Sequence, residues 1–402
     1  MRNITLEQLR VPPMHLRQVE VVERKGIGHP DTICDSIMNE ISVQLCKTYL
    51  REFGTILHHN ADKSLLVAGQ VEHRFGGGRM LEPMKIIFGD RAAYGTAEKT
   101  IDVESLVEGV AHKWFRSNMR FVDPNVHVRY QNEMKPGSAE LVDIFNRKTG
   151  RFLPANDTSA AVGYAPMSET EKLVYALERF YNSPRFKKEH PESGEDIKVM
   201  CLRNGGSLSF TVAMGLVERF VESETAYFRK KEEIREEGLR FLRSKTSMKV
   251  ALDMNTLDAR GRGIRGVYLT LLGTSAEDGD CGQVGRGNRV HGVIPLNRPG
   301  SSEAAAGKNP VSHVGKIYNL LTYRLAERIY RELGNVDEVY VWLLSKIGKP
   351  VDQPHIIAVQ LAHEMELELK ALRPKVNDIV EDEFDHLDRF IHELAHGKIP
   401  VA

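Results

Sequence analysis

The sequence predicts an α+β protein in which helices cover one face of mostly antiparallel or mixed sheets. Three observations favour this class. Segments rich in β-branched and apolar residues recur along the whole chain, and stretches of helical periodicity lie between them. The clearest strand pair is joined by a short turn, whereas parallel βαβ units need long crossovers. Finally, 402 residues exceed one ordinary hydrophobic core and indicate two or three domains.

The predicted strands are short apolar runs bounded by turn residues. Two of them flank Arg203-Asn204-Gly205-Gly206-Ser207, a glycine-rich turn that predicts a hairpin. The full set is 63–71, 84–88, 126–130, 198–202, 208–214, 250–253, 267–272, 338–344 and 355–359.

The predicted helices carry apolar residues at helical spacing. Ser168 and Glu171 have the spacing of a capping box and predict a helix that runs through Phe180. Pro30 suits the first position of an earlier helix. The other helices are expected at 222–246, 314–333 and 375–395.

Composition excludes several classes of protein. The 55 basic and 55 acidic residues cancel, so we expect neither general nucleic-acid binding nor membrane-surface binding, and any phosphate affinity must be concentrated in a site. No apolar stretch approaches the ~18 residues of a membrane span. The four cysteines form no C-x-x-C pair. We therefore expect reduced thiols and a cytoplasmic location.

The chain divides into four expected ranges. We expect an N-terminal α+β domain over 1–130, a central α+β domain over 159–275 and a C-terminal α+β domain over 276–402. Range 131–158 is rich in turn formers and is a candidate active-site lid. Gly137 and Ser138 within it precede a short helical stretch, whose backbone N–H groups could meet a phosphate.

The first chemical motif is Glu23-Arg24-Lys25-Gly26-Ile27-Gly28-His29-Pro30-Asp31. It places His29 and Asp31 at a helix N-terminus, where anions bind. An acidic residue beside phosphates needs a cation between them, so Asp31 is a candidate Mg²⁺ ligand. The structural alternative is a capped helix start with an exposed His and Asp.

The second motif is a glycine-rich stretch that carries three arginines and one lysine. Arg286, Arg289, Arg298 and Lys308 follow an acidic run, and guanidinium groups on such a backbone suit a polyanion, best a triphosphate. The spacing of Gly300 and Gly307 does not match a P-loop. A long surface loop is the structural alternative.

Three smaller signals lie between these motifs: Ala155-Asn156-Asp157-Thr158, Asp196-Ile197-Lys198, and the region of His58 and His59. Taken singly, each is better explained as structural. Neighbouring residues on a strand point to opposite faces, so the two histidines do not predict a zinc site.

Together these pieces resemble the S-adenosylmethionine synthetase family from about Glu23 to Lys316. The resemblance rests on motifs in the family's order: Glu23…Gly28-His29-Pro30-Asp31, Asn156-Asp157 before Gly163-Tyr164-Ala165, Asp196-x-Lys198, Asp280-Cys281-Gly282-x-x-Gly285-Arg286, and Gly307-Lys308-Asn309-Pro310. The longer segments that contain these motifs are similar in sequence to the archaeal branch of the family.

The resemblance implies a role for each matched residue. His29, Lys198, Arg286 and Lys308 would be catalytic and would bind ATP, together with Asp157, Asp196 and Asp280. Gln70 and Asp280 would contact methionine, with the ribose as the other candidate partner of Asp280. Asp31 would hold magnesium, and Glu23 would support a metal or a neighbouring side chain.

The chain departs from the family pattern at four places. Gln70 stands where the family has Glu, Val284 where it has Thr, and Gly287 where it has Lys. The lysine expected shortly after Pro310 is missing, and Lys316 lies nearby.

The resemblance also implies the reaction and the assembly. Methionine sulfur attacks C5′ of ATP and expels triphosphate, which is hydrolysed to diphosphate and phosphate; Mg²⁺ and K⁺ are required. Three similar domains would lie about a pseudo-threefold axis, and a homodimer would share its active sites. Another ATP-dependent kinase or ligase, and a nucleotide-sensing module without turnover, are the alternatives.

Overall fold

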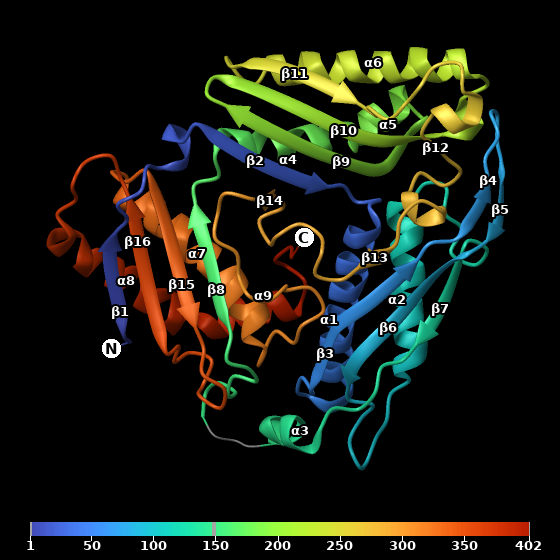
Figure 1. The fold of residues 1–402 in the computed structure, drawn as a ribbon. Helices are drawn as coiled ribbons and strands as arrows, with labels where there is room; N and C mark the ends of the chain where they lie inside the picture. Colours follow the sequence, from blue (N-terminus) through green and yellow to red (C-terminus); the bar gives the residue numbers. More distant parts are fainter. Residues whose placement is uncertain (1, 147–149, 402) are drawn as a thin grey trace.

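The structure is a computed structural model, and it describes residues 2–146 and 150–401. Its strands form three larger sheets and one two-stranded sheet. Figure 1 shows the three larger sheets around the centre of the molecule, each with its own helices. Parallel and antiparallel pairs occur in every larger sheet, so the predicted α+β class with mixed sheets is confirmed.

The first sheet has the order β13-β3-β6-β7, and the hairpin β4–β5 is inserted between β3 and β6. Helix α1 packs on β3 and on α2. The elements are α1 Pro30–Phe53, β3 His59–Val67, β4 Gln70–Glu72, β5 Arg79–Glu82, β6 Met84–Ala92, α2 Val103–Asn118, β7 Val128–Asn132 and β13 Gly282–Gln283.

The second sheet has the order β11-β10-β9-β2-β14, with the short β12 beside β10. Helix α4 packs on β9 and β2, and α6 packs on β11. The elements are β2 Val19–Lys25, α4 Glu169–Tyr181, α5 Pro184–Glu189, β9 Ser193–Asn204, β10 Ser207–Val217, α6 Glu224–Arg243, β11 Lys249–Met254, β12 Leu269–Thr270 and β14 Ile294–Pro295.

The third sheet has the order β1-β16-β15-β8. Helix α7 packs on β8 and β15, and α8 packs on β1. The elements are β1 Ile4–Gln8, β8 Ala160–Ala165, α7 Val314–Leu333, β15 Glu338–Leu344, β16 Ile356–Ala362, α8 Leu369–Asp385 and α9 Leu387–Ala395. Helix α3 Ala139–Asn146 and the short 3₁₀ helices η1 Met14–Leu16, η2 Glu218–Phe220, η3 Gly263–Gly266 and η4 Ser275–Glu277 complete the description.

The three sheets repeat one topology. Each contains an antiparallel pair, a second antiparallel pair and then a parallel pair, in the orders β13-β3-β6-β7, β2-β9-β10-β11 and β8-β15-β16-β1. In each, a helix precedes the two central strands: α1, α4 and α7. This repetition matches the pseudo-threefold arrangement that the family resemblance implies.

The sheets are not continuous in the sequence. Strand β1 pairs with β16 near the other end of the chain, whereas β2 pairs with β9 in the second sheet. Strands β13 and β14 belong to the range 276–402 in sequence, but they pair with strands of the first and second sheets. The ranges 1–130, 159–275 and 276–402 stay predictions of domain limits, and strands from each range are exchanged between the sheets.

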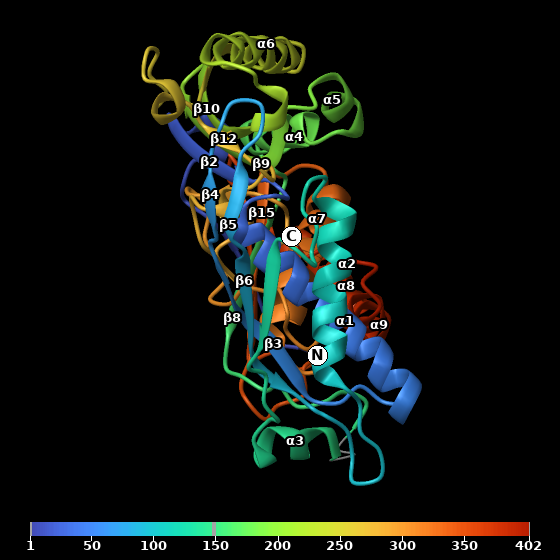
Figure 2. The same cartoon turned by 90° about the vertical axis from the view of Figure 1, so that its right-hand side faces the viewer.

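Apolar residues form two core clusters among the described residues. One cluster lies under the first and third sheets, where α1, α7 and α9 meet, and the other fills the second sheet and its helices. Figure 2 shows α1, α2, α7, α8 and α9 on one side of these sheets. On faces away from the helices, Leu65 is exposed on the first sheet, and Val19 and Leu202 are exposed on the second sheet.

Most predicted elements occur, with three differences. The predicted strand 63–71 is divided, because β3 ends at Val67 and Gln70 begins β4 in the separate two-stranded sheet. Only Leu269–Thr270 of the predicted strand 267–272 pairs with β10, because the N–H groups of Leu271 and Leu272 donate to the Glu277 carboxylate. The predicted helix 375–395 is two helices. His386 separates them, with φ −103° and ψ 18°. None of the described helices combines the length and apolarity needed to cross a membrane.

The predicted capping box at the start of α4 is confirmed. The Oγ of Ser168 accepts the N–H of Glu171 at 3.1 Å, and the Glu171 carboxylate accepts the N–H of Ser168 at 2.6 Å. The Ser168 hydroxyl also donates to Glu20 on β2. The box therefore fixes both the start of α4 and its position on the second sheet.

We expect Ser168→Ala to lower the free energy of unfolding by about 1 kcal/mol, because the N–H of Glu171 loses its acceptor at the helix start. Urea unfolding measures this change. Ser209→Ala is the matched control, since Ser209 is exposed on β10. Equal stability of the two variants would contradict a stabilising role for the box.

Candidate active site

The first chemical motif lies where β2 leads into α1. His29 is the N-cap residue of α1, Pro30 takes the first helical position, and the His29 Nδ1 accepts the N–H of Asp31 at 3.2 Å. His29 and Asp31 are only 7% and 6% exposed. A capped helix start with an exposed His and Asp therefore does not describe this segment.

Charged side chains line the uncovered face of the second sheet beside His29. Lys25 and Lys198 are direct partners across the β2–β9 pair. Lys198 Nζ lies 3.3 Å from Glu23 Oε1, and Lys25 Nζ lies 2.9 Å from Asp31 Oδ2. The Lys198 side chain is 44% exposed, so its ammonium group is accessible to an anion.

A cavity of about 530 Å³ opens at this end of the second sheet. Its lining includes His29, Asp196, Lys198 and Asp280, and Tyr268 supplies an apolar wall. The Asp196 carboxylate accepts both the N–H and the O–H of Ser275. This volume lies in the range of small-molecule pockets.

Burial sets the protonation of two groups in this cavity. Burial lowers the pKa of His29 to about 4, and the nearby Lys25 and Lys198 act in the same direction. The ring is therefore neutral near pH 7. Since Nδ1 accepts the N–H of Asp31, the ring hydrogen lies on Nε2, which can donate to a phosphate oxygen. Burial also raises the pKa of Asp196 to about 6.

Two carboxylates on α1 hold the loop that carries Arg286. Asp31 Oδ1 accepts the N–H of Gln283 at 2.8 Å, while Asp35 accepts the N–H groups of Gly285 and Gly287 at 2.7 and 3.1 Å. Lys25 Nζ donates to the carbonyl oxygen of Arg286 at 2.7 Å. The Arg286 side chain is exposed beside this corner.

The same clamp explains a departure from the family pattern. A Cβ at Gly287 would lie 2.1 Å from Asp35 Oδ2, so a lysine here would displace the carboxylate. No role for Asp35 was predicted from the sequence. Its signal was a second carboxylate one helical turn after Asp31, on the same face of α1.

A second group of predicted residues surrounds Lys308. Lys308 is 2% exposed, and its Nζ forms ion pairs with Asp62 on β3 and with Glu303, the latter at 3.0 Å. The backbone of Gly307 packs on β3: a Cβ there would lie 1.7 Å from the carbonyl oxygen of Ala61. Only glycine permits this approach, which brings Lys308 to Asp62.

The start and the end of the predicted lid lie near the Lys308 group. Gly137 is packed on His58, since a Cβ at Gly137 would lie 2.4 Å from His58 Nδ1, and Ser138 follows it. Asn156 N–H donates to the carbonyl oxygen of Ser312 at 3.2 Å, which places Asp157 near the end of the Gly307 loop. Range 131–158 thus contains the last two residues of β7, helix α3 and the described residues 150–158 that lead toward β8. Residues 147–149 of this predicted lid lie outside the described residues.

The predicted site residues therefore form two groups in one chain. On β3, Asn60 bridges to Lys308 and Leu65 pairs with Gln283. At strand spacing these points are about 15 Å apart.

The first group contains Glu23, His29, Asp31, Asp196, Lys198, Asp280 and Arg286. Gln70 lies near it, since the N–H of Gly69 donates to Ala276 at 3.1 Å. The second group contains Gly137, Ser138, Asp157 and Lys308.

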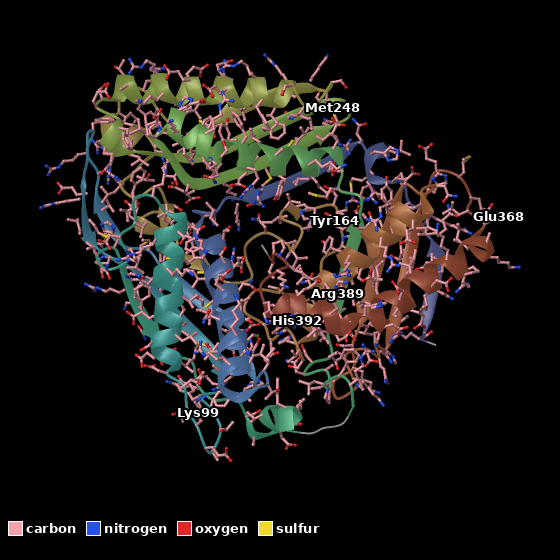
Figure 3. The ribbon with its side chains drawn as sticks, turned by 180° about the vertical axis from the view of Figure 1, so that it is seen from behind. Lys99, Tyr164, Met248, Glu368, Arg389 and His392 are labelled. Carbon is pink, nitrogen blue, oxygen red and sulfur yellow. The ribbon has the colours of Figure 1, made fainter. Side chains whose placement is uncertain are left out.

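Arg298 does not belong to either group, which corrects its interpretation as a polyanion ligand. It is buried and forms ion pairs with Glu171 at 3.3 Å and Glu338 at 2.8 Å. Its guanidinium lies 4.3 Å over the ring of Tyr164, which is labelled in Figure 3. Arg298 joins α4 of the second sheet to β15 and β8 of the third.

One three-residue group of possible metal ligands occurs among the described residues: His73, Glu277 and Asp278. The His73 ring already bridges two carboxylates, at 2.9 Å to Glu218 and 2.8 Å to Asp278. These hydrogen bonds, to Asp278 first, raise the pKa of His73 to about 10, so the ring is protonated and unavailable to a metal near pH 7. Glu23 and Asp31 belong to no such group.

The fold is of the α+β class, and the first group gathers neutral and cationic hydrogen-bond donors around one cavity. A family model for S-adenosylmethionine synthetase (AdoMet synthetase) matches residues 2–398. The chain therefore belongs to the S-adenosylmethionine synthetase family.

Individual relatives agree with this assignment. The chain is 44% identical to a probable S-adenosylmethionine synthase of Aquifex aeolicus, with all of both chains covered. It is 43% identical to the S-adenosylmethionine synthase of Pyrococcus furiosus over 100% of this chain and 99% of the relative. The corresponding values for Methanothrix thermoacetophila are 42%, 99% and 99%. Most such relatives are archaeal, as the resemblance predicted.

A solved structure shows likeness of fold. The S-adenosylmethionine synthetase of Campylobacter jejuni matches with a TM-score of 0.59 and 15% sequence identity, over 94% of both chains. At this identity the likeness concerns the fold alone.

We expect the stability contributed by Asp35 to depend on pH. Burial raises its pKa to about 7, above the ordinary value of an unfolded Asp. The folded state therefore binds the Asp35 proton more tightly than the unfolded state does. The free energy of unfolding that this proton contributes is lost as pH rises from about 4 to 7, by up to roughly 4 kcal/mol. In urea unfolding, Asp35→Asn should lack this decline.

Asp102→Asn is the matched control for this measurement. Hydrogen bonds from Ser105 lower the pKa of Asp102, so its contribution is instead lost as pH falls. If the difference between wild type and Asp35→Asn is constant from pH 4 to 7, Asp35 does not titrate in this range.

Proposed function

We propose that the first group binds the triphosphate of ATP and stabilises its departure as methionine sulfur attacks C5′. Synthesis of S-adenosylmethionine from ATP and L-methionine is the activity of the family to which the chain belongs. The observation that carries the proposal is the convergence of the neutral His29, the exposed Lys198 and the clamped Arg286 loop on one corner. Each is a donor suited to phosphate oxygen.

The reaction mainly requires stabilisation of the leaving group, the triphosphate. A thioether sulfur has no proton to lose, so the first step needs no general base. Preorganised donors that meet charge developing on the triphosphate supply most of the rate, and loss of one such donor typically costs on the order of 10² to 10³. His29, Lys198, Arg286 and Lys308 have this role in the proposal, and Asp196 and Asp280 orient the substrates, with Gln70 beside methionine.

Glu23 and Asp31 fit a Mg²⁺ ion that is shared with the phosphates. Glu23 Oε1 is buried and accepts no hydrogen bond of good geometry among the described residues; its ion-pair partner there is Lys198 Nζ at 3.3 Å, a group that a bound cation would displace. Asp31 adds a carboxylate at the same corner, and Mg²⁺ usually takes only one or two protein carboxylates with substrate phosphates. The ion, when bound, would neutralise charge on the triphosphate. A requirement for K⁺ is inferred from the family resemblance. A cytoplasmic location is inferred from the four free cysteines.

We propose a homodimer in which each active site combines the first group of one copy with the second group of its partner. Two observations support this arrangement. The two positions on β3 that adjoin the groups are about 15 Å apart within one chain. The sheet faces that carry them are not covered by helices and expose Val19, Leu65 and Leu202. Range 131–158 would close over the shared site as a lid, with Gly137 and Ser138 at phosphate and Asp157 at substrate.

Mass spectrometry after incubation with ATP, L-methionine, Mg²⁺ and K⁺ tests the reaction. We expect S-adenosylmethionine, phosphate and diphosphate. ADP or AMP with a modified second substrate would indicate a kinase or ligase, and unchanged substrates would indicate a nucleotide-sensing module.

We expect Asp31→Asn to weaken productive Mg²⁺ binding, because an amide is a poorer ligand for a hard dication than a carboxylate. The loss in apparent metal affinity should be on the order of 10- to 100-fold, the range that even outer-shell changes produce. Initial rates across a Mg²⁺ titration measure it, and excess Mg²⁺ should recover part of the activity. A titration identical to that of wild type would leave Asp31 only its contacts with Lys25 and Gln283.

Mixed dimers test the shared site. His29→Asn keeps an N-cap acceptor but removes the ring, and Lys308→Met keeps the apolar stem; each alone should be inactive. After the two are denatured and refolded together, a heterodimer has one site with both groups intact. Random pairing then predicts about a quarter of wild-type activity.

The control pairs His29→Asn with Lys198→Met, two changes in the same group. No site in that heterodimer is intact, so it should stay inactive. Failure of the first mixture to regain activity, or recovery by the control, would contradict sharing between these two groups.

A further inference from the structure

A β-bulge interrupts the pairing of β3 with β6 beside Lys308. Asn60 is paired with Arg91 and Lys63 with Gly89, so Ala61 and Asp62 together oppose the single residue Asp90. Asp90 has a φ of 82°, in the left-handed region. Bulges of this kind redirect side chains and are frequent beside active sites.

The bulge lets Asp62 contact two lysines at once. Successive side chains on a regular strand point to opposite faces, so Asp62 and Lys63 would normally be separated. Here Lys63 Nζ lies 2.5 Å from Asp62 Oδ1, and Lys308 Nζ contacts Asp62 Oδ2. One buried carboxylate therefore holds two ammonium groups side by side.

The two lysines differ in what they can offer to a ligand. The Lys308 side chain is 3% exposed and contacts a second carboxylate, Glu303. The Lys63 side chain is 66% exposed, with a further carboxylate oxygen of Asp90 at 3.8 Å. An ion pair exposed to this degree contributes little, so Lys63 can exchange Asp62 for a more highly charged anion.

The family pattern expects a second lysine shortly after Pro310, and the structure places no such group there. Lys316, the next lysine after Pro310 in the sequence, is 1% exposed on α7. Its Nζ donates to Asn39 Oδ1 at 3.0 Å and lies 3.4 Å from Ser42 Oγ, both on α1. The Lys316 ammonium group is therefore buried against α1 and is not accessible to a ligand.

We propose that Lys63 is a phosphate-binding residue that acts beside Lys308 and supplies the second ammonium group of this part of the site. In the absence of substrate, Asp62 holds both lysines in position. When the triphosphate arrives, the exposed Lys63 turns from Asp62 to a phosphate oxygen, while Lys308 keeps its buried partner. The inference rests on the proposed function, because it assigns the anion to the triphosphate chain of ATP.

The test compares Lys63→Ala, Lys63→Arg and Lys99→Ala. Lys99 is the matched control: its side chain is 54% exposed, it pairs with Glu52, and its place on the loop before α2 is labelled in Figure 3. The full-length protein is titrated calorimetrically with tripolyphosphate and Mg²⁺, and the KM values for ATP and methionine are measured separately. Circular dichroism and thermal unfolding verify that each variant is folded.

We expect Lys63→Ala to bind tripolyphosphate about ten-fold more weakly and to raise the KM for ATP, since it loses one charge-assisted hydrogen bond. The KM for methionine should not change. Lys63→Arg should stay within a few-fold of wild type, and Lys99→Ala should match wild type.

Two outcomes would overturn the inference. Wild-type tripolyphosphate affinity in Lys63→Ala would exclude Lys63 from the site, and equal weakening in Lys99→Ala would show only an effect of net charge. The proposed reaction is judged separately, by whether wild type makes S-adenosylmethionine. A wild type that makes it while Lys63→Ala binds normally refutes this inference alone.

Discussion

Two buried carboxylates on α1 hold together the parts of the chain on which the proposed chemistry depends. Asp31 and Asp35 accept backbone N–H groups from Gln283, Gly285 and Gly287. A buried carboxylate without such partners is costly, so these contacts fix the loop tightly against the helix start. The same loop supplies β13 to the first sheet and β14 to the second. The clamp that positions Arg286 thus also joins two sheets.

A second constraint is the close approach of the Gly307 loop to the bulge in β3. Since no side chain fits between Gly307 and Ala61, Lys308 is drawn under the sheet surface to Asp62. A paired acid offsets the cost of burying a charged lysine, and Asp62 and Glu303 are the acids paired with Lys308. Phosphate binding at this end then needs an accessible cation, which is why the exposed Lys63 acquires importance beside the buried Lys308.

Local sequence signals predicted much of the fold. The capping box at Ser168, the hairpin at Gly205 and Gly206, and the helix 314–333 depend on residues close together in the chain, and all three occur. The exchange of β1 and β2 between sheets was not predictable, because strand pairing depends on partners hundreds of residues away. The prediction that Arg298 binds a polyanion was wrong for a similar reason, because its acidic partners Glu171 and Glu338 are distant in sequence.

The sequence by itself determined the family, the class of fold and the residue types at the phosphate corner, because His29, Asp31, Lys198 and Arg286 lie in short motifs whose spacing is local. Only the tertiary structure decided which of them are buried, exposed or clamped. It separated Lys308 from His29, gave Asp35 its role, and set Lys63 beside Lys308. Burial and ion pairing depend on how distant segments pack, and packing has no short-range signature in the chain.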